Sequence, residues 1–192
     1  MAKIPSISDA LKQVVAATEA ALIADTSVNF GRLPKKLYFM HGHQKEVNSV
    51  LQSQAAAAAT QNNRFPLIVL FRDIKEELSI DDGQSYLIDF KARLGIFTLT
   101  DPSYRSDDRE RNNFKPILKP ILEEFINQLT QSLAFQFPTI NQLGLKYYDC
   151  YFYGSSLNGT NVFNDKVDAI EIESISLKLI NTNCTSNKLI ST

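Results

Sequence analysis

Histidine and cysteine are scarce in this chain, whose 192 residues include two of each. His41 and His43 would need a third ligand, such as Glu46 or Asp73, to hold a metal ion, and their spacing matches none of the usual zinc patterns. Cys150 would need one of these histidines beside it to act as a nucleophile. The sequence therefore predicts no metal site, no cofactor and no enzyme activity.

The two cysteines, Cys150 and Cys184, are expected to be free thiols. They could pair only if the fold brought them together, and a cytosolic setting keeps thiols reduced. Cys150 lies in an aromatic strand segment, "YYDCYFY", where a small buried thiol is the ordinary arrangement.

Long apolar runs and an excess of one charge are also lacking. No stretch approaches the roughly 20 apolar residues that a membrane-spanning helix needs, and polar residues interrupt the N-terminal segment too often for a secretory signal. The formal net charge is −1, so no global basic field favours nucleic acid. We expect neither a membrane partner nor a specific nucleic acid partner.

The pattern along the chain predicts one α+β domain over residues 1–192, with a mainly antiparallel mixed sheet of about five strands and helices packed on one side. Residues 1–30 hold an amphipathic helix that ends near Asp25, 35–180 form the core, and 181–192 are a polar tail. The expected strands contain "KLYFM", "RFPLIVLF", "YLIDFKARLGIFTL", "KYYDCYFYGS" and "DAIEIESISLKLI".

Two of these strands carry a clear signal. Within 86–99, the even-numbered residues are apolar up to Ile96, while Asp89, Lys91 and Arg93 alternate with them, so one face should be buried. The continuous apolar run at 65–71 indicates burial on both faces.

The strand at 167–180 changes parity in its middle. Its apolar residues fall on even positions up to Ile172 and on odd positions from Ile175. A bulge at 173–174 would let both sets face one core and would indicate a self-contained fold. A regular strand would instead give its two halves different partners, one of them a terminal helix or a neighbouring subunit.

The segment 105–113 is dense in charge of both signs and is expected to be a loop. Arg105, Asp107, Asp108, Arg109 and Arg111 are its candidate functional residues, either as a solvated surface or as a salt-bridge interface between subunits. The interface alternative predicts that replacing Arg109 and Arg111 by Glu leaves the fold intact and impairs assembly. An apolar helical face follows, and the main packing helix is placed at about 116–134.

The order of these elements resembles the tail terminator and neck-type completion proteins of tailed bacteriophages. The resemblance spans 35–180 and is carried by "RFPLIVLF", "YLIDFKARLGIFTL", "FKPILKPILEEFINQL" and "AIEIESISLKL". It implies a non-enzymatic structural protein that forms a ring, often of six subunits, and contacts tail tube and head-tail connector proteins. It also implies a location in the virion or the host cytoplasm.

A different class of function remains open from the residues alone. A bacterial α+β domain that binds a ligand or regulates another protein would have a pocket between sheet and helix. The aromatic cluster around Cys150 could suggest a nucleic acid platform, but Lys146 is the only basic residue nearby, so packing in a core or interface is the better explanation.

Overall fold

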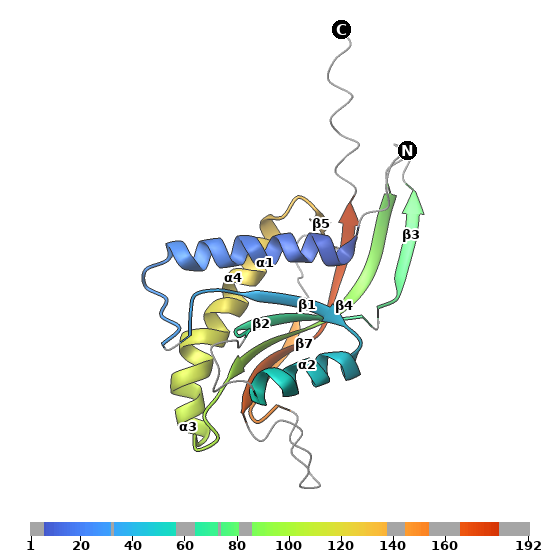
Figure 1. Ribbon diagram of the computed structural model, residues 1–192. Coiled ribbons are helices and arrows are strands. Elements are labelled where there is room, and N and C mark those ends of the chain that lie inside the picture. Colours follow the sequence, from blue (N-terminus) through green and yellow to red (C-terminus); the bar gives the residue numbers. More distant parts are fainter. Residues whose placement is uncertain are drawn as a thin grey trace.

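The computed structural model describes residues 6–31, 33–56, 64–72, 74–80, 86–137, 145–153 and 166–180. Together they form a mixed seven-stranded sheet with helices on both faces (Figure 1). The expected α+β class is confirmed. The polar tail 181–192, with Cys184, lies outside the described residues.

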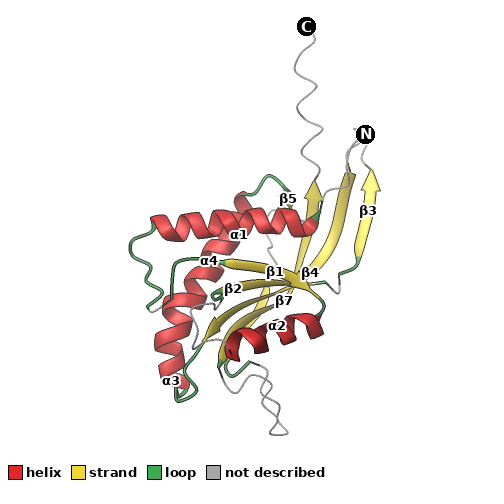
Figure 2. Ribbon diagram, viewed as in Figure 1, coloured by secondary structure: helices red, strands yellow, loops and turns green. Residues whose placement is uncertain are grey.

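Two long antiparallel strands, β4 (Tyr86–Leu99) and β7 (Val167–Ile180), run through the middle of the sheet (Figure 2). Shorter strands lie on the outer side of each. Beside β4 are β2 (Leu67–Phe71) and β3 (Glu76–Ile80), both antiparallel to it. The strand β1 (Tyr38–Gly42) lies outside β2 and is parallel to it.

The outer side of β7 is shared in the same way. The two-residue strand β5 (Phe135–Gln136) pairs with its end, and β6 (Lys146–Cys150) pairs with its first half. Consequently β3 and β5 flank the end of the sheet where β4 begins and β7 finishes, whereas β2 and β6 flank the other half.

The sheet therefore has seven strands rather than about five. The strands β3 and β5 were not predicted from the sequence. All five residues of β3 are exposed, so its sequence, "EELSI", lacks the alternation that a half-buried strand shows. The strand β5 is too short to carry any periodic signal.

The larger core lies on the face covered by α1 (Ile7–Ala24) and α4 (Lys119–Gln131). The Ser6 side chain caps α1 by accepting a hydrogen bond from the Asp9 amide at 3.3 Å. The even-numbered residues of β4 point into this core, as predicted: Ile88, Phe90, Ala92, Leu94 and Ile96.

A second core lies on the opposite face under α2 (Gln44–Ala56). Val47 and Leu51 of α2 pack there with the odd-numbered residues of β2. Every residue of β2 is buried, which confirms burial on both faces. The expectation that all helices pack on one side is wrong, because α2 follows β1 and returns along the other face (Figure 1).

The parity change in β7 is a β-bulge. Ala92 pairs with Ile175 and Leu94 with Ile172, so Arg93 faces both Glu173 and Ser174. The five apolar residues on either side of the bulge all enter the core under α1 and α4: Ile170, Ile172, Ile175, Leu177 and Leu179. The favoured prediction is thus confirmed, and these five residues are buried within one chain.

The main packing helix begins ten residues earlier than expected. Helical backbone starts with α3 (Ser106–Arg109), continues as a π-helix, η2 (Glu110–Leu118), and passes into α4. The Lys119 amide donates to the Phe114 carbonyl five residues back. The prediction placed the helix start at Pro116, but a π-helix has a wider turn that accommodates this proline in its interior.

Candidate functional site

The five charged residues predicted as an interface lie at the start of this helix rather than on a loop. Arg105, Asp107 and Arg111 are exposed. Asp108 accepts hydrogen bonds from the Arg105 amide at 3.3 Å and from Arg111 Nη2 at 2.6 Å. Arg109, by contrast, has a fully buried side chain. The prediction of a solvated or interfacial role is therefore wrong for Arg109.

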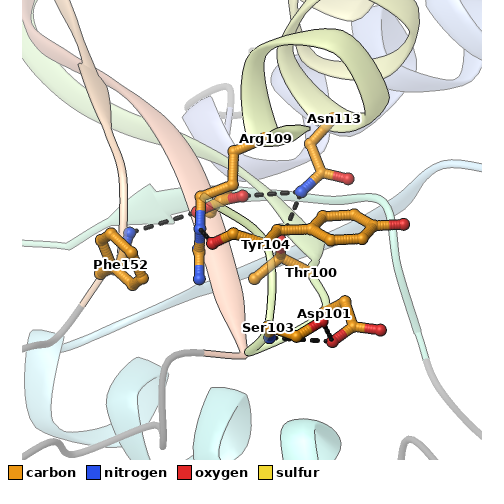
Figure 3. Close-up of polar contacts among 8 residues, drawn as sticks. Thr100, Asp101, Ser103, Tyr104, Arg109, Asn113 and Phe152 are labelled. Atoms are coloured by element: carbon orange, nitrogen blue, oxygen red, sulfur yellow. Dashed lines mark hydrogen bonds and ion pairs between the residues drawn. The ribbon is translucent and has the colours of Figure 1, made fainter. Parts of the chain in front are cut away.

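Arg109 belongs to a buried polar network. Its Nη1 lies 2.5 Å from Asp168 Oδ1, and neither side chain is exposed. Its Nε donates to the Tyr104 carbonyl at 3.1 Å, and its guanidinium lies 3.5 Å from the centre of the Phe152 ring. Figure 3 shows Arg109 reaching between Phe152 and Tyr104. This contact set neutralises and covers a charge that burial would otherwise destabilise.

Asn113, one turn further along the helix, completes the network. Its Nδ2 donates to Asp168 Oδ2 at 2.7 Å and to Thr100 Oγ1 at 2.6 Å (Figure 3). The Phe152 amide donates to Asp168 Oδ1 at 3.2 Å. The two carboxylate oxygens of Asp168 thereby join the helix and the turn after β6 to the start of β7. Asn113 links this network to Thr100, the residue after β4.

The turn after β6 depends on this network. Phe152 has a positive φ of 56°, which costs about 1–2 kcal/mol for a residue with a side chain. Its amide bond to Asp168 and its ring contact with Arg109 hold it there. We interpret the network as a structural anchor, since its charged groups are satisfied from within the chain.

The sequence did contain a signal for this network. Asp168 has the same parity as Ile170 and Ile172, which places a carboxylate on the buried face of a strand. A carboxylate in that position requires a buried donor. Arg109 could have been nominated on that basis, although nothing in the sequence distinguishes it from Arg105 or Arg111.

A second polar cluster lies on the α2 side of the sheet around Glu171. Arg93 Nη2 lies 3.0 Å from Glu171 Oε2, and the Tyr148 hydroxyl donates to the same oxygen at 2.5 Å. This hydrogen bond, with some burial, raises the pKa of Tyr148 to about 12. Arg93 also lies over the Phe71 ring, 4.6 Å from its centre. The cluster links β4, β6 and β7 at the edge of the second core.

Within the part of the chain that the structure describes, His41, His43 and Cys150 do not belong to any group that could hold a metal ion. His41 and His43 are exposed where β1 leads into α2, and His43 Nδ1 accepts from the Lys45 amide at 3.2 Å. The described residues contain no group of three potential metal ligands; Asp73 is not among them. Burial, followed by the charges of Glu171 and Asp149, raises the pKa of Cys150 to about 11, so the thiol stays protonated at neutral pH.

An open groove of about 510 Å³ lies over the part of the sheet that α2 does not cover. Charges of both signs line it, from Lys75, Glu77, Asp89 and Lys91. Its remaining lining residues are Phe90, Ser176 and Leu177. It is thus a feature of the sheet surface rather than the predicted pocket between sheet and helix.

Two outer strands present large side chains to solvent. On β3, Leu78 is 51% exposed and Ile80 63% exposed. On β6, Tyr147 and Tyr148 are 47% and 48% exposed. Of the aromatic cluster expected in a core or interface, Tyr153 is buried. Within the described residues β3 pairs only with β4, and β6 only with β7.

Comparison of the sequence with protein-family models and with curated proteins finds no match. Among the described helices, none combines the length and apolar character needed to cross a bilayer.

Proposed function

We propose that this chain is a non-enzymatic structural protein of a phage or prophage particle, which forms a ring at the tail end or the head-tail junction. The supporting observation is strand β3, an outer strand that exposes both faces and carries Leu78 and Ile80. Unpaired strand edges with exposed apolar side chains favour pairing with another chain, and soluble proteins usually protect them.

A ring requires two different surfaces on each subunit, because a head-to-tail contact joins unlike patches. The sheet offers them: β3 lies outside β4 on one side, and β6 lies outside β7 on the other. Both surfaces belong to a framework in which most apolar residues of β4 and β7 are already packed in cores formed within the chain. The subunit could therefore fold first and assemble afterwards.

The charged helix start contributes less to this proposal than the sequence suggested. Arg105, Asp107 and Arg111 remain available for contacts with tail tube or connector proteins. Arg109 is not available for such contacts, because it is buried in an ion pair with Asp168.

The groove beside β3 favours a second candidate, a domain that binds a small ligand. Its volume of about 510 Å³ falls within the range of small-molecule sites. However, such sites are mostly apolar and concave, whereas four of the seven residues lining this open groove are charged. We therefore rank ligand binding below assembly.

The test is to find the protein in assembled particles. Particles released by the encoding genome are purified, and their proteins are quantified by mass spectrometry with and without the gene. We expect a few copies per particle, and heads separated from tails when the gene is deleted. Normal particles that lack the protein would contradict the proposal.

A further inference from the structure

We propose that β3 of one copy pairs antiparallel with β6 of the next, so that the sheet continues from subunit to subunit. The inference rests on the proposed ring and names the two surfaces that close it. The occupant of each exposed strand edge is a second copy of this chain.

Strand direction permits this pairing. The strand β3 is antiparallel to β4, β4 to β7, and β7 to β6. Consequently β3 and β6 run in opposite directions within one sheet. A neighbour that extends the sheet brings them together antiparallel and keeps the face under α1 and α4 on the same side in every copy.

The side chains match on that face. Leu78 and Ile80 share the face of their partners on β4, Ile88 and Tyr86. Tyr147 shares the face of its own partner on β7, Ile172. Ile88 and Ile172 belong to the same core, so the apolar pair on β3 and the tyrosine on β6 extend one apolar layer.

The other face is complementary in charge. Glu77 and Ser79 of β3 point there, as do Lys146 and Tyr148 of β6. No ion pair joins Glu77 or Lys146 to another described residue. The register with Leu78 opposite Tyr147 places Glu77 opposite Tyr148 and diagonal to Lys146, within reach of an ion pair. Asp149, the acidic residue of β6, is already neutralised by Lys119 at 2.7 Å.

Disulfide cross-linking tests the pairing directly. In a background with Cys150→Ser and Cys184→Ser, one chain carries Leu78→Cys and a second, differently tagged chain carries Tyr147→Cys. Opposed residues on neighbouring strands have Cα atoms about 4.5–5.5 Å apart, which suits a disulfide. We expect mixed dimers of the two chains on oxidation. The control is Leu133→Cys. Leu133 is 86% exposed, so disulfides that form through random collisions should form most readily at this position.

Charge exchange provides an independent readout. Glu77→Lys and Lys146→Glu should each weaken association about fivefold per contact, and the double variant should restore it. Lys115→Glu, an equal charge change at an exposed position of η2, should have no effect.

The possible outcomes distinguish the pairing of β3 with β6 from the proposed function on which it rests. Oligomers that form without the mixed disulfide, or a disulfide from Leu78→Cys chains alone, would overturn the pairing of β3 with β6 and leave the ring proposal standing. A chain that remains monomeric at every concentration and alongside tail tubes would overturn both.

Discussion

Arg109 and Asp168 form an ion pair of 2.5 Å with no solvent exposure on either side chain. They are 59 residues apart in sequence, and they join the start of the main helix to the start of β7. Because Asn113 and the Phe152 amide bind the same carboxylate, one acidic side chain connects three segments of the chain, namely the helix, the turn after β6 and β7 itself. The pair therefore anchors the fold.

Replacing Arg109 by Glu should strongly destabilise the protein. The change places two carboxylates together in a buried site, and breaking a buried pair costs about 3–5 kcal/mol. Arg111→Glu is the matched control, because this exposed residue pairs only with Asp108 among the described residues and should change stability by less than about 1 kcal/mol. Urea unfolding measures both. Equal midpoints for the two variants would contradict the anchor.

A second test of the network compares the buried Asn113 with its exposed neighbour Asn112. Asn113→Asp removes the donor that Asp168 Oδ2 and Thr100 Oγ1 share, and it adds a buried carboxylate. We expect a loss of at least about 2 kcal/mol. Asn112→Asp makes the same chemical change at an exposed position and should stay within about 0.5 kcal/mol. Equal melting temperatures for the two variants would contradict the structural role of Asn113.

Strand periodicity was the most informative signal in the sequence. The alternation over 86–99 identified the buried face of β4, and the parity change at 173–174 located the bulge in β7. Both signals follow from the two-residue period of a strand, which any half-buried strand must obey. The local pattern was sufficient for these two strands because burial against the core under α1 and α4 requires apolar residues at alternate positions.

The bulge in β7 leads to a prediction about length. Deleting Ser174 removes the extra residue and turns Ile175, Leu177 and Leu179 toward the wrong face, unless the strand slips. Each of these side chains contributes about 1.5–3 kcal/mol by burial, so their sum rivals the whole stability of a domain. We expect no cooperative unfolding transition by circular dichroism. The variant Ser174→Ala keeps the length and should unfold cooperatively; a deletion variant with native stability would exclude a required bulge.

The Glu171 cluster predicts a pH dependence. The hydrogen bond to Glu171 raises the pKa of Tyr148 to about 12, so the folded state favours the protonated phenol. Its stabilising contribution is complete below pH 10 and is lost as the pH rises through about 12. Titration of ¹³Cζ-labelled tyrosine by NMR should show this value, and Glu171→Gln should lower it. Glu173→Gln, a change at an exposed position on the same strand, should leave it unchanged.

Features that depend on distant contacts were not predictable. The burial of Arg109 is decided by Asp168, and the local sequence around Arg109 is as polar as a solvated surface. The strand β3 forms because β4 offers it a hydrogen-bonding edge, although its own side chains stay exposed. The helix start was misplaced because Pro116 normally begins a helix, and here a π-helix contains it.

Electron microscopy of a mixture shows directly whether the chain assembles on the tail tube. Tail tubes isolated from particles of the same genome are incubated with the purified chain and imaged in negative stain. We expect a closed ring on one end of each tube, and no ring when the Glu77→Lys variant is used. Tubes with bare ends, beside protein that stays dispersed, would contradict this expectation.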